Sequence, residues 1–335
     1  MMSRSAFLVA AVGAALTATA TARQCDPESD PACSASFNGP SLRVLLGTGS
    51  AEPIDAQNFS FDGRRFRGTF AVDASGAVIN TVPVDAYLYS VVPSEMPHSW
   101  PAEALAAQAI VARTYVLARS NPRRAYDLVT SEADQVYVGA SAERPETNAA
   151  VDATSRRVLR FENGYASVSY FSCCGGHTEA ASEAWSGGSS APYVRGVACT
   201  YCADSSWYRW TRDVALNRLQ NAFAAQGEFG NLQSVDLGER DASGRARFIT
   251  LIGDAGQVRV RGADFRRAIG GRDVPSTLLK SAVIDSDRTK VTLEGAGLGH
   301  GVGFCQWGAR GLAKTGARAP HITTYYFPGT QVSDG

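Results

Sequence analysis

Apolar residues recur at helical spacing over residues 99–119, which makes this stretch the clearest helix in the sequence. Ser99 stands where a cap is expected, and Pro101 and Glu103 suit the first turn. Gln108, Arg113 and Tyr115 are polar or amphipathic members of the helix, for which residue type alone favours surface or snorkelling positions. One face should be buried, because it collects the apolar residues Leu105, Ala109, Ala112 and Val116.

Shorter apolar runs predict strands. They cover residues 41–46, two strands within 66–82 around a turn at Ser75-Gly76, and 86–92, 248–252, 257–260 and 283–293. A second helix is expected over 214–225, and a last short element over 322–326. This mixture predicts an α+β fold, with mixed sheets and helices around a substrate cleft. Residues 41–330 form the main domain, into which a smaller α+β subdomain of about 210–282 is inserted.

Composition narrows the class of protein. The 335 residues balance 32 Lys and Arg against 32 Asp and Glu, so no overall field favours nucleic acid. Residues 1–22 resemble a signal peptide, since Arg4 precedes an apolar run that is too short to span a bilayer. Residues 23–40 read as a flexible leader, and no later segment predicts a membrane helix. We therefore expect a secreted or periplasmic protein of the cell envelope.

The cysteines in the middle of the chain have metal-binding spacing. Cys174 and His177 form a C-x-x-H, and Cys199 and Cys202 form a C-x-x-C. Three thiolates and one imidazole match a closed structural zinc site, with no vacancy for a catalytic water. Disulfides between Cys174 and Cys199 or Cys202 are the alternative in an oxidising compartment. We favour zinc because His177 completes a four-ligand set, and no organic cofactor is predicted.

Two distant segments have the composition of site-building loops. Glu95 lies between Pro93 and Pro97 among apolar neighbours, a setting that keeps a carboxyl protonated as a general acid requires. The alternative is that Glu95 is an ordinary surface residue that caps the next helix. The segment 299–309 surrounds His300 and Gln306 with glycines and places Trp307 beside them, as in a polar ligand-binding wall.

An ordered series of blocks resembles the SpoIID/LytB family of bacterial cell-wall proteins. The resemblance extends from about residue 41 to residue 330, and the series as a whole is more specific than any one block. The matching blocks include 87–97, 100–115, 134–139, 170–179, 192–195, 299–309 and 325–330.

The resemblance implies activity on peptidoglycan. Members similar to SpoIID are lytic transglycosylases that cut denuded glycan strands, whereas LytB-like members enhance an amidase. The family's catalytic acid falls on Glu95 and a functionally important arginine falls on Arg113. Some members hold zinc in the region 174–202. Cys305 and the doubled Cys173-Cys174 depart from the usual pattern.

The chemistry favours a lytic transglycosylase, because hydrolysis usually needs two carboxylates and only Glu95 has a clear case. We expect cleavage of MurNAc–GlcNAc bonds with formation of 1,6-anhydroMurNAc. The sugar-binding residues are then Gln108, Tyr170, His300 and Gln306. The alternative is a non-catalytic, glycan-binding enhancer of an N-acetylmuramoyl-L-alanine amidase. Either protein would have peptidoglycan strands, and in the second case a cell-wall amidase, as partners.

Overall fold

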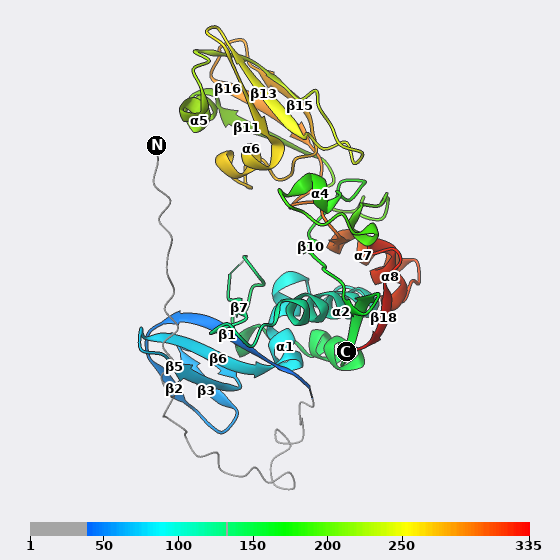
Figure 1. The fold of residues 1–335 in the computed structure, drawn as a ribbon. Coiled ribbons are helices and arrows are strands. Elements are labelled where there is room, and N and C mark those ends of the chain that lie inside the picture. Colours follow the sequence, from blue (N-terminus) through cyan, green and yellow to red (C-terminus); the bar gives the residue numbers. More distant parts are fainter. Residues whose placement is uncertain (1–38, 132) are drawn as a thin grey trace.

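The structure is a computed structural model that describes residues 39–131 and 133–335. The predicted signal peptide, most of the predicted leader, and Cys25 and Cys33 lie outside the described residues. Within the described ranges, no helix combines the length and the apolar character that crossing a bilayer requires. The predicted α+β class is confirmed: helices pack against several small sheets (Figure 1).

A four-stranded sheet begins the described chain, with strand order β5-β6-β1-β7. β1 runs antiparallel to β6 and parallel to β7. Alternate residues of β1, such as Leu42 and Val44, are fully buried, because one face of the sheet covers the core. A second antiparallel sheet, β2-β3-β4, follows β1. The strands are β1 (Ser41–Thr48), β2 (Ala51–Pro53), β3 (Asn58–Phe61), β4 (Arg64–Arg67), β5 (Thr69–Val72), β6 (Ala77–Pro83) and β7 (Leu128–Val129).

The strand predicted over residues 86–92 is wrong, because this segment belongs to helix α1 (Val84–Glu95). Its residues are buried on nearly every side, so the helical period leaves no polar stripe in the sequence. Pro93 falls within the helix near its end. Glu95 therefore stands in the last turn of a helix rather than in a loop.

Helix α2 (Ala102–Arg119) runs close to the predicted bounds. Pro101, not Ser99, occupies the cap position, and no side chain caps the helix. Gln108 and Arg113 are almost completely buried, which contradicts their reading as surface residues. α2 is thus a central helix of the main core. It contacts α1, α3 (Pro145–Ala153), α7 (Gln306–Lys314) and α8 (Ala319–Tyr326).

The remaining elements of the main core come from the middle and from the C-terminal part of the chain. β8 pairs with the C-terminal β18, and β10 pairs in parallel with β17. The second pairing places residues 170–171 beside 304–305. These elements are η2 (Ala140–Ala142), α3 (Pro145–Ala153), β8 (Arg157–Phe161), β9 (Gly164–Tyr165), β10 (Tyr170–Phe171), α4 (Ala181–Ala184), η3 (Pro192–Val194), β17 (Phe304–Cys305), α7 (Gln306–Lys314), α8 (Ala319–Tyr326) and β18 (Gln331–Asp334).

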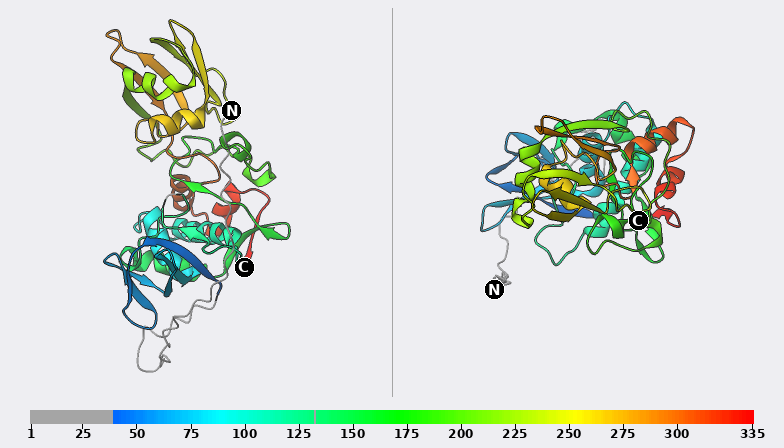
Figure 2. Two further views of the ribbon diagram at one scale, coloured as in Figure 1. Left: turned by 60° about the vertical axis from the view of Figure 1, so that its left-hand side comes forward. Right: turned by 90° about the horizontal axis from the view of Figure 1, so that it is seen from above.

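A second hydrophobic cluster draws its buried residues from between Trp210 and Leu293. It lies at one end of the molecule, and the N-terminal sheet lies at the other (Figures 1 and 2). The stacked rings of Phe223 and Phe265 join its two helices. The predicted strand over 283–293 is a hairpin. The elements are β11 (Trp210–Ala215), α5 (Leu216–Phe223), η4 (Ala224–Gln226), β12 (Leu232–Asp236), β13 (Phe248–Gly253), β14 (Gln257–Arg261), α6 (Gly262–Ile269), β15 (Leu279–Ile284) and β16 (Lys290–Gly295).

Candidate functional site

Glu95 is partly buried at the C-terminal end of α1. The helix carries Glu95 to the segment 134–136, where the backbone N–H of Val136 donates to Glu95 Oε1 over 3.4 Å. Ser94 returns its hydroxyl to the carbonyl of Ser90 one turn earlier, over 2.8 Å. The carboxyl group is therefore carried by a rigid element and oriented by a backbone donor from another segment.

Tyrosine side chains surround this carboxyl group. The Tyr170 hydroxyl is buried, and burial, followed by the negative charge of Glu95, raises its pKa well above the ordinary value. Burial raises the pKa of Tyr115 to about 12, and Glu95 contributes there as well. The rings of Tyr115 and Tyr170 meet edge to face at 6.3 Å. Both phenols stay protonated at neutral pH, so the structure brings Glu95 and Tyr170 together with neutral hydroxyls beside the carboxyl.

His300 lies on the other side of Tyr170. Its Nε2 donates to the Tyr170 carbonyl oxygen over 2.9 Å, and its Nδ1 accepts the N–H of Val302 over 3.1 Å. Its ring packs against Phe171 and the exposed Trp185. Burial lowers the pKa of His300 to about 4, despite the hydrogen bond to Tyr170. The imidazole is thus neutral at physiological pH, with the proton on Nε2, and it holds the backbone of Tyr170.

Two glutamines predicted to bind sugar are buried with unsatisfied amides. Within the described part of the chain, neither amide atom of Gln108 has a hydrogen-bond partner, and the same holds for Nε2 of Gln306. Gln108 precedes Tyr115 by two helical turns, so the two lie on the same face of α2. A buried polar group without a partner is costly, and a hydroxyl-rich ligand or water would satisfy it.

Arg113 does not share this site. Its guanidinium forms an ion pair with Asp85 at 2.8 Å and donates to the carbonyls of Val151 and Arg157. Asp85 stands at the start of α1, ten residues before Glu95, which corresponds to about 15 Å along the helix. Arg113 therefore anchors the opposite end of the helix that carries Glu95.

Four thiols lie together in the core. The Sγ atoms of Cys174, Cys199, Cys202 and Cys305 all lie within 4.8 Å of one another. Tetrahedral zinc with Zn–S bonds of about 2.3 Å needs sulfurs roughly 3.8 Å apart, so the cluster has a suitable size. The N–H groups of Cys174 and Gly308 donate to the Cys305 sulfur over 3.2 and 3.4 Å. Such donors stabilise thiolate ligands, and the donor set fits zinc.

The fourth member of this cluster differs from the predicted ligand. The prediction named His177, but its Nδ1 lies 2.6 Å from the Thr178 carbonyl oxygen, and its imidazole is not among the four clustered groups. Cys305 takes that place because the parallel pairing of β10 with β17 brings it beside Cys174. Cys173 is also buried, and all five of these cysteines are free thiols in the structure.

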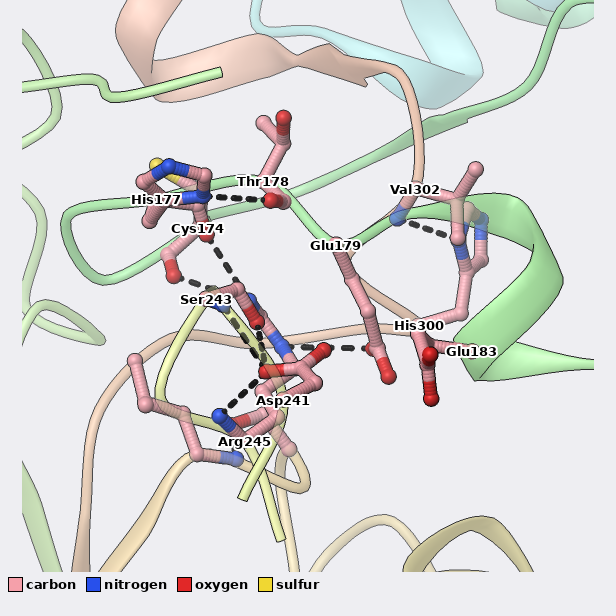
Figure 3. A network of polar contacts seen from close by, with 12 residues as sticks. Cys174, His177, Thr178, Glu179, Glu183, Asp241, Ser243, Arg245, His300 and Val302 are labelled. Atoms are coloured by element: carbon pink, nitrogen blue, oxygen red, sulfur yellow. Dashed lines mark hydrogen bonds and ion pairs between the residues drawn. The ribbon is translucent and has the colours of Figure 1, made fainter. Parts of the chain in front are cut away.

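A buried ion pair, which the sequence analysis did not single out, supports the cysteine loop. Arg245 Nε lies 3.4 Å from Glu179 Oε2, and both side chains are nearly inaccessible. The Arg245 guanidinium also donates to the carbonyls of Cys174 and His177 (Figure 3). Gly301 has a φ of +87°, and a Cβ there would lie 2.7 Å from Arg245 Nε. Arg245, from the segment between β12 and β13, thus holds the Cys174 loop by hydrogen bonds and packs against Gly301, next to His300.

Comparisons with known proteins show which sequences are similar to this chain. A family model described as Stage II sporulation protein matches residues 73–161, and one described as Domain of unknown function (DUF8618) matches residues 199–303. The chain is 34% identical to an uncharacterized protein of Brachyspira hyodysenteriae over 263 residues, which is 77% of this chain and 68% of that protein.

Two proteins of Bacillus subtilis (strain 168) are also similar. Stage II sporulation protein D is 30% identical over 276 residues, which cover 76% of each chain. The protein named Amidase enhancer is 27% identical over 292 residues, covering 73% of this chain and 40% of its own length.

Proposed function

Because the chain belongs to the SpoIID/LytB family, we propose that it is an exported lytic transglycosylase acting on denuded peptidoglycan. It cuts the bond between MurNAc and GlcNAc and leaves a 1,6-anhydroMurNAc end. The observation that carries the proposal is the setting of Glu95. One carboxyl group receives the Val136 N–H and faces neutral tyrosine hydroxyls.

Glu95 acts first as an acid and then as a base. It gives its proton to the glycosidic oxygen, the bond from MurNAc C1 to that oxygen breaks, and GlcNAc leaves as the alcohol. The carboxylate then takes the proton of the MurNAc C6 hydroxyl, whose oxygen forms the new bond to C1. No water is consumed, and the nucleophile is intramolecular, which gives it a high effective concentration.

The surroundings of Glu95 support a mechanism with one carboxylate. Asp134 is the nearby acid in sequence, two residues before Val136. Its Oδ1 accepts the Tyr115 hydroxyl over 3.2 Å and its Oδ2 accepts the Val129 N–H over 2.9 Å. A carboxylate held in this way is poorly suited to activate water, as the base of a hydrolase must.

The remaining predicted residues have supporting roles in this proposal. Tyr170 places a hydroxyl at the Glu95 carboxyl, and His300 holds Tyr170. The unsatisfied amides of Gln108 and Gln306 are inaccessible in this structure, so sugar hydroxyls would reach them only if the surrounding side chains moved. Arg113 acts as a positioning residue, since it fixes the start of α1. A zinc ion would be held by Cys174, Cys199, Cys202 and Cys305, with a structural role, because four thiolates leave no coordination position for a reacting group.

A second candidate function rests on the similarity to Amidase enhancer. In that reading the protein binds glycan without cutting it, and Glu95 accepts hydrogen bonds from sugar hydroxyls. Export to the periplasm or the cell exterior is common to both functions.

Mass spectrometry of products from purified denuded glycan tests the proposal. The wild-type protein should release fragments with anhydroMurNAc ends, and Glu95→Gln should release none, while both bind the strands. The control is Glu52→Gln, which changes an exposed carboxyl on β2. Reducing MurNAc ends would instead indicate hydrolysis. Glycan binding without cleavage, together with stimulation of an amidase that Glu95→Gln retains, would favour the enhancer.

A further inference from the structure

A basic pocket lies beside the Glu95 site. It has a volume of about 770 Å³ and opens at the C-terminal end of α2 and the loop that follows. Its polar lining residues are Arg119, Arg123, Arg124, Tyr126, Asp127 and Asp134. The arginines of the pocket have no part in the proposed reaction.

The acids in the pocket are already engaged. Asp127 is nearly inaccessible, forms an ion pair with Arg43 at 3.0 Å and accepts the N–H of Asn121 over 2.8 Å. Asp134 is bonded by Tyr115 and Val129, as described above. The Arg43 guanidinium therefore compensates the charge of Asp127, whereas Asp134, whose partners are neutral, keeps its negative charge, so that the three arginines face one uncompensated carboxylate among the described lining residues.

Among the residues that the structure describes, no carboxylate pairs with the three arginines of the pocket. Over residues 39–131 and 133–335, no carboxylate lies within ion-pair distance of Arg119, Arg123 or Arg124. The Arg119 guanidinium is held over the Tyr115 ring at 3.5 Å. The pocket thus presents an excess of positive charge, part of it fixed in place, and favours an anionic ligand.

Two connections place this pocket next to the carboxyl group of Glu95. Asp134 lines the pocket, and two residues later Val136 donates to Glu95 Oε1, so the two points are at most about 7 Å apart along the backbone. Tyr115, beneath Arg119, touches Tyr170, which faces Glu95. A glycan with its scissile bond at Glu95 would place a neighbouring sugar at the pocket.

We propose that Arg119, Arg123 and Arg124 form an anion subsite that binds a carboxylate of the glycan strand next to Glu95. This inference rests on the proposed function, from which it takes the glycan as ligand. Each muramic acid unit carries a lactyl group, whose carboxylate is free only where the stem peptide has been removed. Guanidinium groups bind carboxylates through paired, charge-assisted hydrogen bonds. The subsite selects carboxylate-bearing strands over neutral ones.

Binding measurements with chemically modified strands test the subsite. The probes are denuded glycan oligomers, the same oligomers with their lactyl carboxylates converted to methylamides, and neutral chitin oligomers. Kd is measured by calorimetry in a Glu95→Gln background, which keeps the strands intact. We expect the methylamide and chitin oligomers to bind about tenfold more weakly than the denuded strands, the size of one charge-assisted hydrogen bond.

Replacing Arg119, Arg123 and Arg124 with Gln should weaken the binding of denuded oligomers about tenfold and leave that of the neutral oligomers unchanged. The matched control is Arg272→Gln, an exposed arginine after α6. Equal affinity for all probes in the parent protein, or no effect of the triple variant, would overturn the subsite. Tight binding of peptide-bearing strands through the same arginines would overturn the lactyl assignment in favour of stem-peptide carboxylates. If the wild-type protein released no anhydro products but still preferred carboxylate-bearing oligomers over neutral ones, the proposed reaction would be rejected and the subsite retained.

Discussion

The Nε2 atom of His300 donates a hydrogen bond to the backbone carbonyl of Tyr170 across 2.9 Å, although 130 residues separate the two in the chain. This bond ties the glycine-rich segment 299–309 to Tyr170, whose hydroxyl faces Glu95. His300 does not need to touch the substrate to matter, because it fixes the residue whose hydroxyl faces the candidate acid.

The partly buried imidazole of His300 predicts how the stability of the protein changes with pH. His300 has a pKa of about 4 when folded, below its ordinary value of 6.5. Between these values the unfolded chain binds more protons, so the free energy of unfolding should fall as pH drops from 6.5 to 4, by at most about 3 kcal/mol. Urea unfolding at several pH values should show that the free energy of unfolding falls less over this pH range in His300→Gln than in the wild type. The exposed His321→Gln should follow the wild type, and an unchanged slope in His300→Gln would contradict the burial argument.

Removing the hydroxyl of Tyr170 should slow cleavage without unfolding the protein. We expect Tyr170→Phe to lower kcat about tenfold, a change of about 1.4 kcal/mol, with little change in KM, because it removes the buried neutral hydroxyl beside the Glu95 carboxyl. Tyr165→Phe, in the exposed strand β9, is the control. A wild-type kcat in Tyr170→Phe would mean that the tyrosine serves packing alone.

The buried position of Arg113 predicts a loss of stability. Arg113→Ala leaves Asp85 without its cation, although the Ser155 hydroxyl still donates to it, and leaves two backbone carbonyls without the arginine donor, which should cost about 3 kcal/mol of unfolding free energy. Arg113→Lys should cost less, since it keeps the charge but not the paired geometry. Denaturant titration, carried out together with the cleavage assay, separates a structural role of Arg113 from a catalytic one. Full stability with lost cleavage would point instead to a direct catalytic role.

The cysteine cluster predicts which residues hold zinc. Cys305→Ser should lower both the zinc bound per chain and the melting temperature, because it removes one of four clustered sulfurs. His177→Gln should keep the metal. Elemental analysis of the purified proteins, with thiol titration before and after chelation, measures both effects. Zinc loss in His177→Gln but not in Cys305→Ser would restore the ligand set predicted from spacing. Absence of free thiols in zinc-free protein would favour disulfides.

Local sequence was sufficient for features that depend on nearby residues. The helix now described as Ala102–Arg119 was predictable because its apolar residues repeat at helical spacing. The proximity of Cys199 and Cys202 was predictable from their spacing. The family blocks singled out Glu95 as the acid, but its catalytic role stays a prediction, since geometry alone does not test it.

Tertiary structure decided what depends on contacts between distant segments. α1 was mistaken for a strand because it is buried on nearly all sides, which removes the polar stripe that reveals a helix. Cys305 joined the cysteine cluster, and His300 reached Tyr170, because β10 and β17 pair across the chain. Arg113 lies far from Glu95 because it binds Asp85 at the start of α1, whereas Glu95 is the last residue of that helix. The sequence thus determined which chemical groups are present and which neighbours they have along the chain. The pairing of strands and the packing of helices determined which of them meet, since such contacts leave no local periodicity to read.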